Sequence, residues 1–122
     1  RTCMATTVRA DEHELADAIR TGARHRREQL FGAYFEGTDR SDAFGSAYEG
    51  IYRLPADATG IRPKGIYKFF ACLDDRVRRC PEPGCIKQHF LDTLIIHLND
   101  DHQWSRERIA AYIDGEGDDT SG

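Results

Sequence analysis

Apolar residues in the first half of the chain recur at the spacing of amphipathic helices. A capping-box-like sequence at Asp11 predicts the start of the first helix, and two further apolar sets occupy residues 30–35 and 43–51. The three apolar faces comprise Leu15, Ala18, Ile19, Gly22 and Ala23; Leu30, Phe31, Ala33, Tyr34 and Phe35; and Ala43, Phe44, Ala47, Tyr48 and Ile51. Gly45 and Gly50 each weaken the third helix by up to about 1 kcal/mol relative to alanine, so we expect them to admit a closely packed neighbour.

The second half of the chain has a different pattern. Residues 54–65 are rich in proline and glycine and predict a loop. Residues 66–73 are aromatic and β-prone, and after a turn residues 76–80 can return as a second strand. Apolar residues between positions 85 and 97 then follow helical spacing, and Ser105 can cap a last helix. The predicted order in this half is therefore ββα, followed by a short helix.

Together these elements predict an α+β fold that is mainly helical. The N-terminal helices pack on an embedded ββα unit, and a short helix follows that unit. The length of 122 residues fits one domain. We expect this domain over residues 11–113, with a helical part at 11–54 and a second part at 66–113. It is flanked by a disordered N-terminus at residues 1–10 and an acidic, glycine-rich disordered tail at residues 114–122.

Two thiols and two imidazoles stand in paired clusters in the second half. Cys80 and Cys85 have four residues between them, and so do His97 and His102. Zinc prefers four nitrogen or sulfur ligands, and two short clusters can supply them from two local elements. Residues five apart do not share a face of an ideal helix, so the helix must loosen near residues 99–101 for both imidazoles to reach one ion. The sequence therefore predicts a zinc site, made of all four side chains, that stabilises the domain.

This pattern resembles a Cys2His2 zinc finger, and the resemblance covers about residues 66–102. Phe90 and Leu94 correspond to the internal apolar pair of that family, although they stand closer together than is usual there. The resemblance implies a zinc-bound ββα unit. Residues 97–105 also resemble a segment of small uncharacterised bacterial and phage proteins, and this second resemblance implies no activity.

The alternative for this cluster is a disulfide between Cys80 and Cys85, beside two ordinary histidines. We favour zinc because the two histidines have a matching spacing and because no secretory signal points to an oxidising compartment. The protein is accordingly expected in the cytoplasm. Cys72 follows three apolar residues and is expected to be a small buried residue, whereas His89 is a spare candidate ligand.

The charge of the chain gives no general attraction to nucleic acid. There are 17 basic and 21 acidic residues, which give a formal net charge of −4. The last nine residues hold four of the acids and no base, so the remainder of the chain is neutral. Binding to nucleic acid would depend on local patches, for which the candidates are Arg24, Arg26, Arg27, Arg76, Arg78, Arg79 and Lys87. No apolar run approaches the roughly 18 residues that a membrane-spanning helix needs.

These observations favour a non-enzymatic adaptor module that binds another protein and uses zinc as a structural staple. The alternative is a regulator that binds nucleic acid through a single finger and the arginine patches, although the predicted finger helix is apolar on nearly every side. A more remote alternative is a zinc hydrolase. A hydrolase would need an open position on zinc, with His102 displaced and Asp100 or Asp101 acting as the base.

Overall fold

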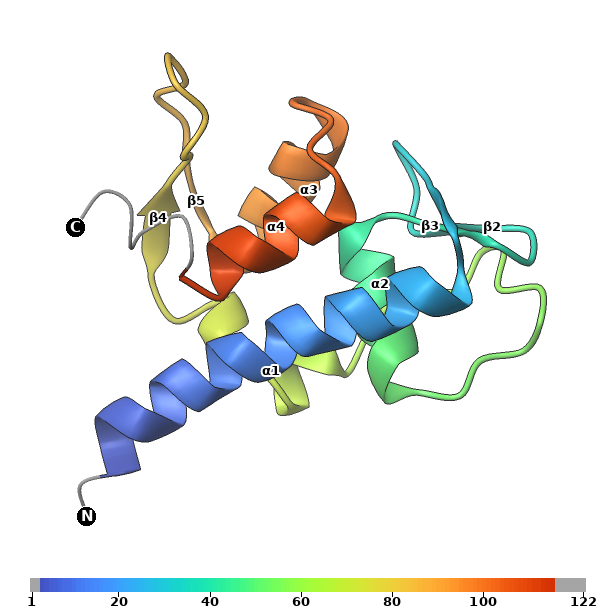
Figure 1. Ribbon diagram of the computed structural model, residues 1–122, viewed down its shortest axis with the longest axis horizontal. Coiled ribbons are helices and arrows are strands. Elements are labelled where there is room, and N and C mark those ends of the chain that lie inside the picture. Colours follow the sequence, from blue (N-terminus) through green and yellow to red (C-terminus); the bar gives the residue numbers. More distant parts are fainter. Residues whose placement is uncertain (1–2, 116–122) are drawn as a thin grey trace.

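The computed structural model describes the backbone of residues 3–115 and the side chains of residues 11–115. Within this range the fold is α+β, as predicted, with four helices and two small sheets (Figure 1). The helices are α1 Cys3–His25, α2 Ala43–Ile51, α3 Leu91–Asp100 and α4 Arg106–Ile113. The strands are β1 Glu28–Gln29, β2 Phe35–Glu36, β3 Arg40–Ser41, β4 Val77–Arg79 and β5 Gln88–Phe90, and the 3-10 helices η1 Ile66–Lys68 and η2 Ala71–Leu73 precede β4. None of the described helices combines the length and the apolar character needed to cross a membrane.

The long helix α1 packs against α2 and α4 (Figure 1). Two glycines allow α1 and α2 to approach closely. A Cβ added at Gly22 would collide with the carbonyl oxygen of Ser46, and one added at Gly50 would collide with that of Ala18. The close neighbour that the sequence predicted at Gly50 is therefore α1.

Buried side chains from all four helices form one apolar cluster. Its largest fully buried members are Leu15, Ile19, Ile66, Leu73, Leu91, Leu94, Ile95, Leu98 and Ile109. Burial of a side chain of this size contributes roughly 1.5–3 kcal/mol relative to leaving it exposed. Helix α3 is thus held by apolar packing against the rest of this core.

A three-stranded sheet at one end of the molecule replaces the predicted second helix. Its strand order is β1-β3-β2, with β1 parallel and β2 antiparallel to β3. Residues 30–35, which were predicted to be helical, lie in a loop and in β2. Hydrogen bonds to distant residues explain the difference, because the Asn99 side-chain amide donates to the Leu30 carbonyl and the Leu30 N–H donates to Ser41. The local apolar pattern does not reveal such partners.

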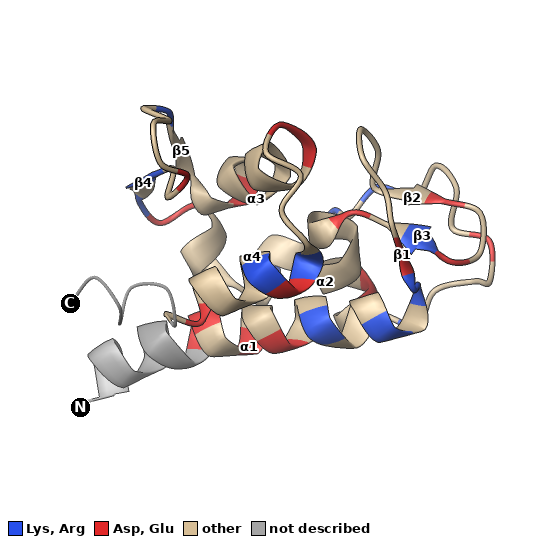
Figure 2. Cartoon of the chain, turned by 45° about the horizontal axis from the view of Figure 1, so that its top comes forward, with Lys and Arg blue, Asp and Glu red and all other residues tan. Residues whose placement is uncertain are grey.

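The second sheet is the antiparallel hairpin of β4 and β5, at the opposite end of the molecule from β1–β3 (Figures 1 and 2). The strand predicted at residues 66–73 is wrong, because this segment forms η1 and η2. Its buried residues Ile66, Phe70 and Leu73 are spaced by three or four positions, which suits helical turns and not a strand. The predicted second strand is β4, and its partner β5 follows the cysteines. Strands β4 and β5 and helix α3 thus occur in ββα order.

Helix α1 begins at Cys3, eight residues before the predicted start at Asp11. The helix thus includes part of the segment 1–10 for which disorder was expected. The Asp11 carboxylate does not cap a helix but accepts a 2.8 Å hydrogen bond from the backbone N–H of Cys72. Asp11, which the sequence predicted as a local helix cap, therefore makes a long-range contact with Cys72 instead.

The last helix agrees with its prediction. The Ser105 hydroxyl accepts a 3.0 Å hydrogen bond from the N–H of Arg108, which caps α4. Asp114, the first residue of the predicted acidic tail, is the C-cap of α4 and pairs with His13 and Arg20 of α1. The rest of that tail, residues 116–122, lies outside the described residues.

Candidate metal centre

The connection between β4 and β5 carries both cysteines. Cys80 extends the strand pairing, because its N–H donates a 2.9 Å hydrogen bond to the carbonyl of Lys87. The Cys85 N–H donates to the Glu82 carbonyl at 3.0 Å, which closes a tight turn. Gly84 in this turn has a φ of 86°, a backbone conformation that glycine adopts without steric cost. A tight turn therefore brings the two cysteines close together in the chain.

The two histidines lie on either side of the C-terminus of α3. His97 is in the last turn of the helix, and His102 follows it. The N–H groups of Asp101 and His102 both point to the His97 carbonyl, at 2.9 and 3.4 Å, so the helix widens as it ends. Gln103 has a φ of 55° and reverses the chain toward α4. The predicted loosening near residues 99–101 is confirmed, since the helix ends at Asp100.

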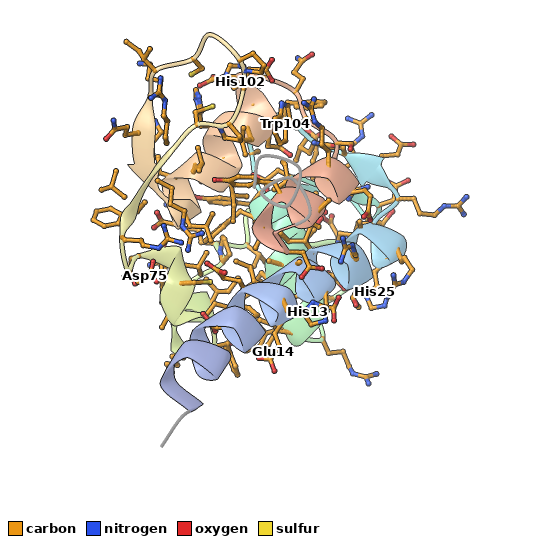
Figure 3. All side chains as sticks on the ribbon, turned by 60° about the vertical axis from the view of Figure 1, so that its left-hand side comes forward. His13, Glu14, His25, Asp75, His102 and Trp104 are labelled. Atoms are coloured by element: carbon orange, nitrogen blue, oxygen red, sulfur yellow. The ribbon has the colours of Figure 1, made fainter. Side chains whose placement is uncertain are left out.

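The hairpin turn and the end of α3 bring Cys80, Cys85, His97 and His102 together. One potential ligand atom from each residue lies within 4.8 Å of the others. The Cys85 Sγ is 3.5 Å from the His97 Nε2, and the ring centroids of the two histidines are 4.6 Å apart. Figure 3 shows His102 beside the loop that joins β4 and β5. Both cysteines are free thiols, so the disulfide alternative is not formed in this structure.

One nitrogen in this cluster has no hydrogen-bond partner among the described residues. The Nε2 atom of His102 is buried and unpaired. A buried polar atom without a partner costs about 1–3 kcal/mol, and such atoms are rare in folded proteins. A metal ion at the centre of the cluster would take up the lone pair of this nitrogen.

The other histidine is oriented by an acid. The Nδ1–H of His97 donates a 2.7 Å hydrogen bond to the carboxylate of Asp101, one helical turn further on. With the proton on Nδ1, the lone pair of Nε2 faces Cys85. Metal-binding histidines commonly have a carboxylate on the nitrogen opposite the metal, which fixes the tautomer and the ring orientation.

The thiols and imidazoles of the site shift one another's pKa values. The backbone N–H of Lys87 and the neighbouring His97 imidazole lower the pKa of Cys85 to about 6. Burial raises the pKa of Cys80. Burial lowers the pKa of His97, but Cys85 and Asp101 raise it by more, so the net shift is upward. A bound cation would favour the thiolate of both cysteines and the neutral form of both histidines, the states that ligate metals.

The spare candidate ligands lie outside this four-residue group. His89, in β5, has its ring centroid 5.3 Å from that of His97, and the two residues line the same shallow pocket. Cys72 is buried, as predicted, and its pKa is raised by burial and by Asp11. Figure 3 places His13 and His25 on α1, away from the hairpin.

The basic residues proposed for nucleic-acid contact fall into two separate groups, one at the C-terminal end of α1 and one in and around the hairpin (Figure 2). Two of them are engaged within the fold. Arg26 is 3% exposed and donates to the Glu49 carboxylate at 2.8 Å. Arg78 donates to the Glu12 carboxylate at 2.7 Å. The remaining five are exposed: Arg24, Arg27, Arg76, Arg79 and Lys87.

Sequence reasoning did not assign a supporting role to three residues around the site. Asp101 orients His97, and its position four residues after a helical histidine was a usable signal. Glu82, between the cysteines, accepts a 2.6 Å hydrogen bond from the indole Nε1 of Trp104. No local pattern predicts that pair, because Trp104 precedes α4 and Glu82 lies in the hairpin.

No protein-family model, curated protein or solved structure matches this chain. The function is therefore inferred from the site itself. Within the described residues, Cys80, Cys85, His97 and His102 form a cluster that could hold a metal ion.

Proposed function

We propose that this protein is a non-enzymatic protein-interaction module in which one structural zinc ion is bound by Cys80, Cys85, His97 and His102. The observation that carries the proposal is the buried, unpaired Nε2 of His102 inside a group of two thiols and two imidazoles. A buried nitrogen without a hydrogen-bond partner is explained if it is a ligand of a metal ion. The cytoplasm, where thiols stay reduced, would suit this site.

The donor set favours zinc over the common alternatives. Calcium and magnesium prefer oxygen ligands, whereas two thiolates and two imidazoles match the preference of zinc. Two negative thiolates also balance the charge of a divalent ion. The order β4, β5, α3, with the cysteines between the strands and the histidines at the end of the helix, supports the resemblance to a Cys2His2 finger.

Four protein ligands favour a structural role. A catalytic zinc ion keeps a position open for water, with three protein ligands. Here His102 directs a buried nitrogen into the cluster, so a hydrolase would require this residue to move away. A structural ion would join the β4–β5 hairpin to the end of α3 and would contribute directly to the free energy of folding.

The burial of α3 favours a protein partner over a nucleic acid. Six of the ten residues of this helix are buried: Leu91, Leu94, Ile95, His97, Leu98 and Asn99. A finger helix that reads DNA must present side chains to the major groove, and α3 has little surface left for that. The nucleic-acid alternative depends instead on Arg24, Arg27, Arg76, Arg79 and Lys87, which are exposed.

The metal proposal is tested by the metal content of the purified chain. We expect about one zinc per chain, and cobalt(II) exchange should produce the absorption of thiolate-ligated tetrahedral cobalt. The Cys85→Ser and His102→Ala variants should lose the ion, whereas His25→Ala, on the exposed end of α1, should keep it. Zinc-free wild-type protein that cannot be loaded, or equal zinc in all variants, would contradict the proposal.

The class of partner is tested by the salt dependence of binding. A complex held by phosphate contacts weakens steeply as salt rises, with the logarithm of affinity linear in the logarithm of concentration. An apolar protein interface changes little. Tight, salt-sensitive binding of a DNA or RNA oligonucleotide by the zinc-loaded chain would favour the nucleic-acid alternative.

A further inference from the structure

The hairpin of β4 and β5 has two faces of different character. Because side chains alternate along a strand, cross-strand partners share a face. Val77 pairs with Phe90, and Arg79 pairs with Gln88, so these four side chains belong to one face, which we call the outer face. The remaining pair, Arg78 and His89, belongs to the inner face.

The inner face is used by the fold. Arg78 donates to the Glu12 carboxylate of α1, and the ring of His89 lies near that of His97. Both inner residues are half-buried, whereas all four residues of the outer face are exposed. The outer face therefore has no partner among the described residues.

Apolar side chains are prominent in this exposed region. Val77 is 50% exposed and its partner Phe90 is 45% exposed. Ile86, in the connection two residues before β5, is 78% exposed. These are three of the six large apolar residues that are exposed in the described part of the chain, and all three lie within one hairpin. Single exposed apolar residues need no explanation, but a group of them indicates an interaction site.

The hairpin is also basic within an acidic chain. Residues 76–90 contain four basic residues and one acid, while the whole chain has a net charge of −4. The acid is Glu82, whose carboxylate is held by the Trp104 indole. Arg76, Arg79 and Lys87 are exposed, so the hairpin presents apolar groups together with positive charge.

We propose that the outer face of the β4–β5 hairpin binds an acidic protein segment that carries apolar side chains. The apolar residues of such a segment would cover Val77 and Phe90 on the outer face and Ile86 in the adjoining connection, and its carboxylates would meet Arg79, Arg76 and Lys87. This inference rests on the proposed interaction function and names the surface and the chemistry of the partner.

Charge and side-chain type separate this partner from two others. A second copy docked hairpin to hairpin would place the basic residues of both copies together, and like charges across an interface are unfavourable. A single-stranded nucleic acid would satisfy the charge, but it binds by stacking bases on aromatic rings. Of the three exposed apolar residues only Phe90 offers such a ring, whereas Val77 and Ile86 are aliphatic and favour a protein segment.

The inference is tested by selecting peptides from a displayed random 12-residue library on the immobilised, zinc-loaded full chain. We expect the enriched peptides to combine acidic and apolar residues. Synthetic versions should bind Phe90→Ser and Arg79→Glu at least about tenfold more weakly than wild type, as expected for central contacts of an interface.

Matched controls lie at the other end of the molecule. Phe31 is 45% exposed, like Phe90, and Arg24 is an exposed arginine like Arg79. Phe31→Ser and Arg24→Glu should therefore change the affinity less than about twofold. Zinc content is measured on every variant, so that a loss of binding is compared only among chains that keep the ion.

Three results would overturn the inference: no enriched peptide, enriched peptides without acidic residues, or binding that the two hairpin variants leave unchanged. Competition by a mixed-sequence single-stranded DNA 12-mer, with a steep salt dependence and a loss in the hairpin variants, would assign the surface to nucleic acid instead. Formation of dimers that the hairpin variants abolish would assign it to a second copy.

If zinc is present and peptides bind elsewhere, the proposed function stands and this inference fails. If zinc does not bind, the proposed function fails whatever the peptides do.

Discussion

The indole Nε1 of Trp104 donates a 2.6 Å hydrogen bond to the Glu82 carboxylate, which joins the start of α4 to the turn between the two cysteines. Trp104 is 6% exposed, is the single tryptophan of the chain, and has the Arg108 guanidinium 3.7 Å from its ring centroid. The bond is one of the polar links that attach the hairpin to the helices. It places an intrinsic fluorophore next to the candidate metal centre.

Removal of the metal should therefore change the fluorescence of Trp104. A chelator that strips the ion releases the cysteine turn, so the indole loses its acceptor and becomes more hydrated. We expect a red shift of the emission, reversed when zinc is added back. Glu82→Ala should show part of this red shift even with zinc bound. It should also lose about 1–3 kcal/mol of unfolding free energy, and Glu82→Gln should lose less. Identical spectra with and without chelator would contradict this coupling.

Asp101 should control the affinity of the site for zinc without being a ligand. Its carboxylate accepts the Nδ1–H of His97 at 2.7 Å and so presents Nε2 to the cysteines. Loss of such a supporting carboxylate typically weakens metal binding about 10–100-fold. We expect a loss of zinc affinity of this size for Asp101→Ala, measured by competition with a chromophoric chelator. The affinity of Asp101→Asn should lie between those of wild type and Asp101→Ala. The control Asp39→Ala, which removes an exposed acid near the three-stranded sheet, should match wild type.

Removal of a ligand should loosen the hairpin more than the helices. Val77, Ile86 and Phe90 are exposed, so the hairpin has little apolar packing of its own, whereas the helices share a buried core. In Cys85→Ser or His97→Ala we expect the amide NMR signals of residues 77–90 to lose their dispersion, while the far-UV circular dichroism stays close to wild type. Full dispersion of the hairpin signals in these variants would contradict a structural role for the ion.

Asp42 should make stability fall as the pH rises. Burial raises its pKa from 3.8 to about 8 and the negative charge of Asp100 adds to this, against the lowering effects of the Gly45 N–H and of Arg106. Between about pH 4 and pH 8 the Asp42 carboxyl of the folded protein holds a proton that the unfolded chain has released. This contribution is therefore greatest below about pH 4 and is lost as the pH approaches 8, with a slope of up to about 1.4 kcal/mol per pH unit.

Asp42→Asn isolates that effect. Asparagine cannot ionise, and its side-chain oxygen can still accept the 2.6 Å hydrogen bond from the Gly45 N–H that caps α2. The difference in unfolding free energy between wild type and variant, measured in urea from pH 4 to pH 8, should move in favour of the variant as the pH rises. A constant difference across this range would contradict the raised pKa.

Gly50→Ala should destabilise the protein although alanine is the better helix former. In an open helix this change would stabilise by about 1 kcal/mol. Here the added Cβ meets the carbonyl oxygen of Ala18 in α1, and neither backbone can yield without moving a helix. We expect a net loss of about 1–3 kcal/mol, as for overpacked cores, measured as a lower urea midpoint. An unchanged or raised midpoint would mean that the two helices separate easily.

The two cysteine and histidine pairs, the loosened end of α3 and the Ser105 cap could be predicted from the sequence because each depends on residues close together in the chain. Cys80 and Cys85 share a tight turn, His97 and His102 span one helix end, and the zinc preference for such donors is a matter of chemistry. The close approach at Gly50 was likewise predictable. Glycine weakens a helix, and its missing Cβ lets a neighbouring backbone pack closely.

The tertiary structure decided what depends on distant partners. Residues 66–73 form helical turns and residues 30–35 a loop and strand, because their burial and hydrogen bonding are set by α3 and by the sheet at Ser41. The pairing of β4 with β5 across the cysteine turn, the Glu82–Trp104 bond and the burial of Arg26 arise in the same way. Local spacing and donor chemistry determined which side chains could form a metal site, whereas the partner of each strand and of each buried charge depended on contacts that form only when the whole chain packs.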